Sequence, residues 1–378
     1  MERSCGRKLF LTTASLILIV FALTSARAQS GRVQATPTPT PEDDSVKIST
    51  EEIKLNVLAF DEQGRFFPDV TTNDLVITED NILHQPTSVR RIPANVLIVM
   101  DTGGELRAMK SLDWTRKVAA AVVSSLRPDD SVAVMQYSDK AEIVDEWTTD
   151  KSETLNAIAK KTSFGRRDVF VDALRLATDF LLREPMENRQ LVLITDGTDS
   201  QGRSSAKFDA FQRLTATDVS VHVLSYSRME SADIEPRTRG ISKTPAPKAM
   251  PDEIAAQLPN GARDAAQAVK IGPTINLDRT MLRQLKARKA DLDTSQSQLE
   301  KLAENTNGEF ILPDSTDEMV EKAPLVARMI DAAYVVTYMP KTPVVATRGI
   351  AERSIEVTSK RPGLIVQARR KLLFNTKN

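Results

Sequence analysis

Cysteine and histidine are almost missing from this sequence, which contains one Cys and two His among 378 residues. So few of these residues cannot build a disulfide framework, and they leave no thiolate or imidazole set for a zinc site. A metal ion bound by this chain must therefore be held by oxygen ligands. The shortage of histidine also argues against catalysis by a Ser-His-Asp triad.

An excess of charge is missing as well, because 51 Lys and Arg residues balance 51 Asp and Glu residues. Binding to a nucleic-acid backbone needs clustered basic residues, so we expect no nucleic-acid partner. The contents of hydrophobic residues, 41%, and charged residues, 27%, are ordinary for a globular protein. They exclude a disordered chain, a multi-span membrane protein and a collagen-like fibre, and the length suggests about two domains.

The first 28 residues have the pattern of a secretory signal peptide. Three basic residues within residues 1–8 precede an apolar run over residues 9–23, and a small-x-small cleavage pattern ends at Ala28. The alternative is an uncleaved membrane anchor, but this run is shorter than the ~20 residues of a span. Cleavage after Ala28 would remove Cys5, the single cysteine. We therefore expect a secreted or periplasmic protein with no membrane contact after cleavage.

Residues 29–50 form a Thr/Pro-rich linker, in which residues 35–42 read A-T-P-T-P-T-P-E. This alternation favours extended polyproline II structure and cannot pack a core. From Ile53 the apolar residues recur with a period of two, which predicts a small β-sandwich-like unit over residues 51–93. The same alternation returns over residues 350–374, which we expect to complete this unit.

Residues 94–340 have a different pattern, in which continuous apolar runs alternate with helical periodicity. Such runs are typical of strands covered on both faces. The sequence therefore predicts an α/β fold with a doubly wound, mainly parallel, Rossmann-like sheet. Its expected strands are residues 95–100, 131–137, 190–195, 220–224, 309–312 and 333–338, with residues 140–147 as an antiparallel edge strand.

A long insertion at residues 228–293 interrupts this pattern with six prolines and many charges. We expect it to be mostly loop, with a basic helical piece over residues 281–289. Ser295-x-x-Gln298 resembles a capping box, which predicts that a separate helix begins there.

Two of the predicted parallel strands run directly into an acid, Asp101 after one and Asp196 after the other. In open α/β sheets, ligands bind beyond the carboxyl ends of the strands. Two aspartates at this edge on neighbouring strands can share one hard cation. The alternative interpretation is that each aspartate caps a helix or tightens a turn.

These acids lie in segments that resemble a known family. The segment Asp101-Thr102-Gly103-Gly104-Glu105 is similar to the Asp-x-Ser-x-Ser motif of von Willebrand factor type A domains, and Thr195-Asp196-Gly197 is similar to their later aspartate motif. The order of elements over residues 53–372, apart from the insertion, resembles a bacterial subgroup of VWFA-related domain proteins.

The resemblance implies a metal-ion-dependent adhesion site for Mg²⁺ or Ca²⁺ at the sheet edge. Its candidate ligands are Asp101, Glu105, Asp168 and Asp196, while Gly103 stands where the family has its first serine. Glu105 and Asp168 replace a serine and a threonine, so the site is more acidic than the family pattern. One expectation is a calcium-like site saturated by carboxylates. The other is that Arg166 or Arg167 supplies the positive charge and no metal binds.

The function expected from the resemblance is that of an exported, non-enzymatic binding protein. Its partner would be an unidentified protein of the envelope or the extracellular space, engaged in protein–protein interaction or adhesion. One alternative is a metal-dependent hydrolase or phosphatase with Asp101 as nucleophile, although Gly103 stands where its acid/base aspartate would be. The other alternative is a metal-free scaffold that binds through the insertion or the β unit.

Overall fold

The computed structural model describes residues 52–104, 111–242, 259, 274–275, 278–341 and 349–376. The chain divides into Met1–Ile48 and Ser49–Asn378, and all described residues belong to the second unit. The predicted signal peptide and the Thr/Pro-rich linker lie outside the described residues. Within the described residues, no helix has both the length and the apolar character needed to cross a bilayer.

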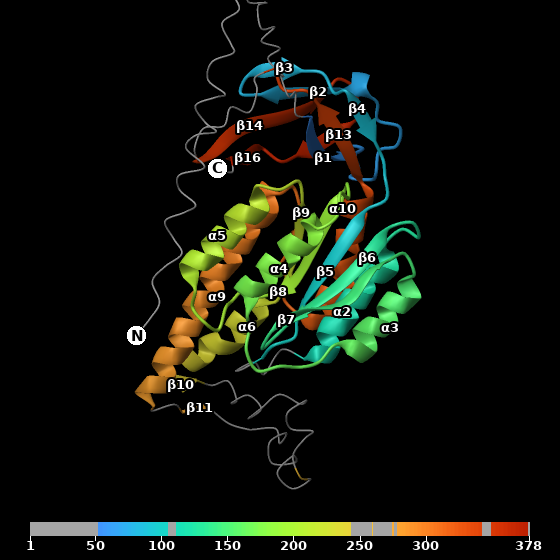
Figure 1. The fold of residues 1–378 in the computed structure, drawn as a ribbon. Helices are drawn as coiled ribbons and strands as arrows, with labels where there is room; N and C mark the ends of the chain where they lie inside the picture. The colour runs from blue at the N-terminus through green and yellow to red at the C-terminus, as the bar shows by residue number, and fades with distance from the viewer. Residues whose placement is uncertain are drawn as a thin grey trace, which may run out of the picture. The chain divides into compact units, whose positions relative to one another are not determined.

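A six-stranded sheet forms the centre of the α/β part (Figure 1), in the order β12-β9-β8-β5-β6-β7. Each pair of neighbours is parallel except β6 and β7, so the predicted antiparallel edge strand is confirmed. The doubly wound, mainly parallel α/β fold is likewise confirmed. The strands are β5 (Asn95–Asp101), β6 (Ser131–Tyr137), β7 (Ala141–Thr148), β8 (Arg189–Thr195), β9 (Ser220–Ser225) and β12 (Phe310–Ile311).

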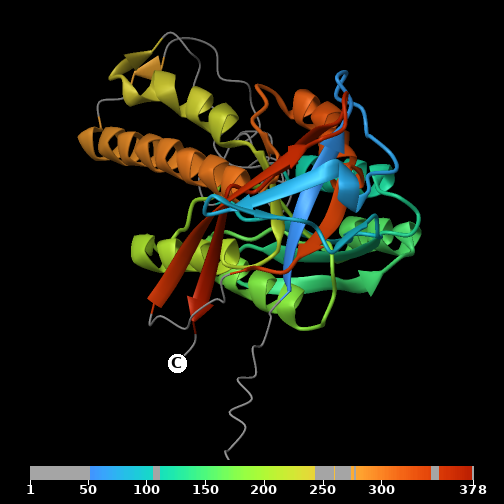
Figure 2. The ribbon, with the colours of Figure 1, turned by 90° about the horizontal axis from the view of Figure 1, so that it is seen from above.

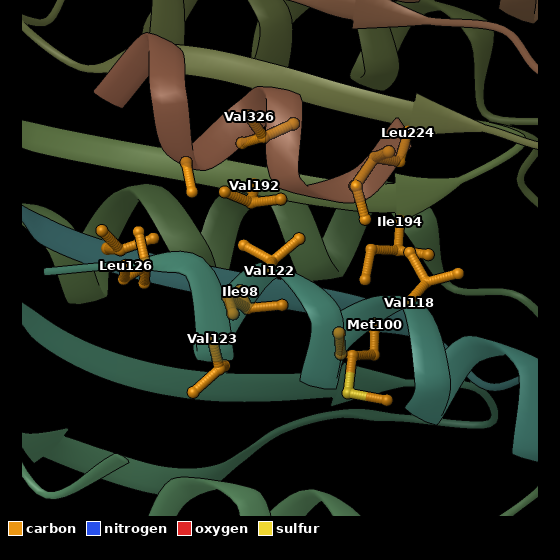
Figure 3. Packing of buried hydrophobic residues seen from close by; sticks show 14 of the residues in the cluster. Ile98, Met100, Val118, Val122, Val123, Leu126, Val192, Ile194, Leu224 and Val326 are labelled. Atoms are coloured by element: carbon orange, nitrogen blue, oxygen red, sulfur yellow. The ribbon is translucent and has the colours of Figure 1, made fainter. Parts of the chain in front are cut away.

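Helices cover both faces of this sheet. One apolar cluster joins the strands to α2 (Leu112–Ser125), α3 (Lys151–Lys161) and α10 (Thr316–Asp331). Figure 3 shows part of it, with Val122 of α2 and Val326 of α10 beside the sheet. A second cluster joins the opposite face to α4 (Phe170–Leu182), α5 (Ser204–Thr215) and α9 (Arg279–Asn305). The strands β5, β6, β8 and β9 are buried on both sides, and their apolar runs are therefore continuous.

Two four-stranded sheets share one further apolar core and together make a β-sandwich-like unit. Residues from both ends of the described chain meet in them, since β15 pairs with β1 and β14 pairs with β2. One sheet contains β15 (Ile365–Ala368), β1 (Ile53–Phe60), β13 (Ala333–Tyr338) and β4 (Ser88–Arg90). The other contains β16 (Lys371–Thr376), β14 (Gly349–Ser359), β2 (Leu75–Glu79) and β3 (Ile82–His84), and a short 3-10 helix, η1 (Thr72–Asp74), precedes β2.

The assignment of β13 to the α/β sheet was wrong. This strand pairs antiparallel with β1, from Ala333 opposite Leu58 to Tyr338 opposite Ile53. All six of its residues are buried, so its apolar run looks like that of a parallel strand. Burial of both faces does not tell which sheet a strand joins, and the sequence pattern reports only the burial.

The insertion is more helical than its composition predicts. It contains α6 (Ser227–Ile234), the 3-10 helix η2 (Glu235–Thr238) and a short hairpin of β10 (Ile241–Ser242) with β11 (Thr274–Ile275). Residues 243–258, 260–273 and 276–277 of the insertion lie outside the described residues.

The long helix α9 corrects two predictions at once. It is one helix of 27 residues that begins after Asp278, whose side chain accepts hydrogen bonds from the backbone N–H groups of Thr280 and Met281. Figure 2 shows it, in orange, as a single continuous rod. The basic piece and the helix expected to start at Ser295 are therefore parts of one element. Ser295 is a buried mid-helix residue that accepts a hydrogen bond from Lys207 of α5 at 3.0 Å.

Candidate functional site

Three of the four candidate acids lie together at the carboxyl edge of the sheet. Asp101 ends β5, Asp196 follows the neighbouring β8, and Asp168 lies in the loop before α4, all three buried. Their common neighbour is the buried hydroxyl of Tyr137, whose pKa is raised well above its usual value. Burial is the main cause, and the negative charges of the three acids add to it. Glu105, the fourth candidate, lies outside the described residues.

The oxygens of Asp101 accept hydrogen bonds from within the chain. Its Oδ1 accepts from the backbone N–H of Gly103 at 3.1 Å. The hydroxyl of Tyr226, which follows β9, donates to Asp101 Oδ2. The oxygens that would face a cation therefore face hydrogen-bond donors in this structure.

Asp196 lies in a similar arrangement, with a guanidinium as one of its donors. Its Oδ1 accepts from both the backbone N–H and the hydroxyl of Thr198, each at 2.8 Å. Its Oδ2 accepts from Nη2 of Arg288 at 2.8 Å. Asp196 is fully buried, and the side chain of Arg288 is 20% exposed.

Arg288 contacts two further oxygens from different elements. Its Nη1 donates to the hydroxyl oxygen of Thr198 at 2.7 Å, and its Nε donates to Oε1 of Glu230 on α6 at 2.8 Å. Glu230 is also buried, so the ion pair joins two buried carboxylates to one cation. We call Asp101, Asp168, Asp196 and Glu230 the acidic edge.

The sequence interpretation missed both Arg288 and Glu230, and a signal for Arg288 was present. Leu285, Leu292 and Leu299 are buried at seven-residue spacing along α9. Arg288 lies three residues after the first of them and four before the second, which puts it on the same face. A charge within an apolar stripe is the sign of a buried ion pair.

Among the described residues, the cation that forms ion pairs with the acidic edge is Arg288, whereas Arg166 and Arg167 form no ion pair with it. Both of those residues are exposed. Their backbone N–H groups donate to the carboxylate of Asp139, at 3.3 Å and 3.1 Å. Their side chains are directed to the surface beside the acidic edge.

Gly103 explains why the serine of the family pattern is missing. A Cβ atom built on Gly103 would lie 2.0 Å from the carbonyl oxygen of Arg167 and 2.2 Å from Oδ1 of Asp168. Real Cβ contacts are never this short, so no side chain fits there. The backbone of Gly103 and the side chain of Asp168 therefore lie in close contact.

The other acids near the edge have structural roles. Asp199 accepts a hydrogen bond from the backbone N–H of Val171 at the start of α4, at 3.0 Å. Arg203 donates to both oxygens of Asp172, at 2.9 Å and 3.1 Å, and also to Asp199. Asp172 lies in the first turn of α4, where a carboxylate is favourable. In the described part of the chain, both acids are engaged in these structural contacts.

A divalent cation does not fit this arrangement of the described residues. The part of the chain that the structure describes has no group of three or more acid, His or Cys side chains placed to hold a metal ion. An ion would have to displace the Tyr226 hydroxyl from Asp101 and the guanidinium of Arg288 from Asp196. The four-acid site stays a prediction, because Glu105 is not among the described residues.

Comparison with known proteins gives one family match. Residues 96–198, from β5 to the loop after β8, match the model of the von Willebrand factor type A domain. A search of curated proteins gives no match.

Several solved structures are similar to this chain. Protein BatB from Bacteroides thetaiotaomicron is 14% identical, over 63% of this chain and 98% of that one, with a TM-score of 0.38. A von Willebrand factor type A protein from Catenulispora acidiphila is 10% identical, over 82% and 75%, with a TM-score of 0.42. A mutant of the PilB minor pilin from Streptococcus sanguinis is 11% identical, over 64% and 62%, with a TM-score of 0.37.

The family is identified by the sequence match over residues 96–198. The match covers both strands that end at Asp101 and Asp196, which also carried the resemblance. The chain therefore contains a von Willebrand factor type A domain.

Proposed function

We propose that this chain is an exported, non-enzymatic binding protein that engages a protein partner at the carboxyl edge of its six-stranded sheet. The observation that carries the proposal is the von Willebrand factor type A match over residues 96–198, which contains this edge. Export is proposed from the signal-peptide pattern of residues 1–28.

The state of Asp101 favours binding over catalysis. A nucleophilic carboxylate must reach a substrate. Asp101 is fully buried, and its two oxygens accept hydrogen bonds from Gly103 and Tyr226. The hydrolase alternative therefore has less support than a binding role. An assay with an aryl phosphate tests it, since activity that is lost in Asp101→Asn would favour the enzyme.

The small sheets lie away from the carboxyl edge of the six-stranded sheet. They contact the α/β part at the opposite end of its strands, where Asn56 donates to Ser220 Oγ at the start of β9 at 3.1 Å. Arg369 likewise donates to the carbonyl oxygens of Thr217 and Val219, which both lie just before β9. Figure 1 shows the same arrangement, with the β unit at one end of the sheet and β10 and β11 at the other.

The exposed pair Arg166 and Arg167 lies beside the acidic edge, in the loop that contains Asp168. We propose that these two side chains contact the partner, because nearby basic charge attracts an acidic protein surface. The cation that the resemblance implies, Mg²⁺ or Ca²⁺, is not required in this proposal.

The experiment is a pull-down from envelope and extracellular fractions with the immobilised protein, followed by cross-linking and mass spectrometry. We expect a captured protein whose cross-links fall near Arg166 and Arg167, and whose binding is lost in the variant Arg166→Glu/Arg167→Glu. The matched control is Arg370→Glu/Lys371→Glu, which reverses two exposed charges at the β unit.

Two outcomes would contradict the proposal. Capture that is lost in the control variant but kept in the Arg166/Arg167 variant would favour a scaffold that binds through its β unit. Cross-links confined to residues 228–293 would favour binding through the insertion.

A further inference from the structure

The acidic edge gathers carboxylates that have to be compensated within a buried environment. Asp101 and Asp196 are fully buried, and Asp168 and Glu230 are 3% and 5% exposed. Burying carboxylates without compensation is costly, so such groups are paired with a cation or hydrogen-bonded. In the family that the sequence resembles, a divalent ion provides this compensation.

The side chain of Arg288 makes the contacts that an ion would make with part of this edge. It lies 2.8 Å from Asp196 Oδ2, 2.7 Å from Thr198 Oγ1 and 2.8 Å from Glu230 Oε1. A guanidinium has a fixed positive charge and donates in several directions within one plane. It can therefore bind oxygens from the loop after β8 and from α6 at the same time.

The rest of α9 holds this guanidinium in place. Leu285 and Leu292, on the same face as Arg288, are buried in a cluster with Ile234 of α6. Further along the helix, Leu299 packs beside Gly197, directly after Asp196. The arginine is thus fixed by apolar contacts on both sides, and its position does not depend on its own ion pairs alone.

We propose that the guanidinium of Arg288 takes the place of the divalent cation at the acidic edge. The chain carries its cation covalently, on a helix that the insertion contributes. A metal ion in such a site keeps a position free to bind a carboxylate of the partner, whereas the guanidinium donates inward to Asp196, Thr198 and Glu230. Binding at this edge is therefore independent of divalent ions, and this inference does not depend on which partner binds.

The test is a calorimetric titration of the purified protein with MgCl₂ and with CaCl₂, together with thermal unfolding in each salt and in EDTA. The wild-type protein is expected to give no saturable heat and the same Tm in all three conditions. Arg288→Gln is expected to have a lower Tm and to gain a saturable, ion-dependent increase in Tm. Without the guanidinium, a divalent ion can bind the carboxylates of the acidic edge. Lys286→Gln, which removes an exposed cation from the same helix, is expected to behave like the wild type.

Three results would overturn the inference. They are saturable ion binding by the wild-type protein, an Arg288→Gln protein with the wild-type Tm, and a folded Arg288→Gln protein that binds neither ion. If Arg288→Gln does not fold, Arg288→Lys replaces it. That variant keeps the charge without the planar donors, and is expected to melt below the wild type and to bind no ion. A Lys variant with the wild-type Tm would overturn the inference too.

Discussion

At the scale of single residues, Gly103 lies where two loops of the acidic edge come closest together. The space that a Cβ atom needs is taken by the carbonyl of Arg167 and the carboxylate of Asp168. The backbone carbonyl cannot turn away without moving its loop. This glycine is therefore required by packing, and not by a left-handed backbone conformation.

We predict that Gly103→Ala lowers the free energy of unfolding by about 1–3 kcal/mol, the usual cost of overpacking. Urea unfolding measures it. Gly104→Ala is the control, because its Cβ would meet only the ring of Phe164, at 2.8 Å, and that side chain can turn. If the two variants were equally stable, the close approach at Gly103 would not be as described.

His222 gives a second prediction at this scale. Burial lowers the pKa of its imidazole from 6.5 to about 4. Its Nδ1 accepts from the backbone N–H of Glu309 at 3.1 Å, and its Nε2 lies 3.0 Å from Gln190 Oε1, so the neutral ring is satisfied. Because the unfolded chain binds this proton more tightly than the folded one, stability falls as the pH drops from about 6.5 towards 4.

The size of this effect is set by about 1.4 kcal/mol for each unit of pKa difference. We predict that His222→Asn reduces the acid sensitivity of the free energy of unfolding by up to ~3 kcal/mol across that window. Urea unfolding of both proteins at a series of pH values measures the difference in slope. Parallel pH profiles would show that the pKa of His222 is the same in the folded and the unfolded chain, and would contradict the lowered pKa.

At the scale of elements, α9 positions the guanidinium that pairs with the acidic edge. Its buried leucines recur every seven residues, and Arg288 and Ser295 complete the same face with an ion pair and a hydrogen bond. The Ser-x-x-Gln motif predicted a helix start in the middle of this stripe. A local capping signal is weak compared with the apolar contacts that hold the whole face against the sheet.

We predict that Leu292→Ala lowers the free energy of unfolding by about 2–5 kcal/mol, the usual range for a fully buried leucine. Ser297→Ala is the control, since this exposed hydroxyl donates to the carbonyl of Asp293 in its own helix. Urea unfolding followed by circular dichroism measures both. A loss of less than about 1 kcal/mol in Leu292→Ala would mean that α9 is not docked as described.

At the scale of the whole molecule, hydrogen bonds between residues far apart in the sequence connect the α/β part with the β-sandwich-like unit, and α9 with the loop after β8. Asn307 Nδ2 donates to the carbonyl oxygens of Asn56 and Gln367, at 3.1 Å and 3.2 Å, which ties the loop before β12 to β1 and β15. Arg288 and Asp196 are 92 positions apart. Both contacts depend on the tertiary fold, and no local pattern of residue types tells which two residues each contact joins.

Features set by local sequence patterns could be predicted from the sequence, whereas contacts between residues far apart in the sequence could not. The strand ends at Asp101 and Asp196 were predictable, because an apolar run followed by an acid is a local pattern and parallel strands end at one edge. The pairing of these acids with Tyr226 and Arg288 was not, because both partners come from later elements. The leucine stripe of α9 indicates that Arg288 is buried, but it does not tell which acid Arg288 pairs with. The sheet that β13 joins was not predictable either, since all six of its residues are buried and its run has no alternation.

The guanidinium of Arg288 compensates the buried carboxylate of Asp196 at the acidic edge. A double-mutant cycle with Arg288→Gln, Asp196→Asn and the double variant, measured by urea unfolding, tests this pairing. Removing one member of a buried pair costs about 3–5 kcal/mol, because the other charge is left uncompensated. The double variant should therefore be more stable than the sum of the two losses predicts, by about 1–3 kcal/mol. Additive losses would contradict the claim.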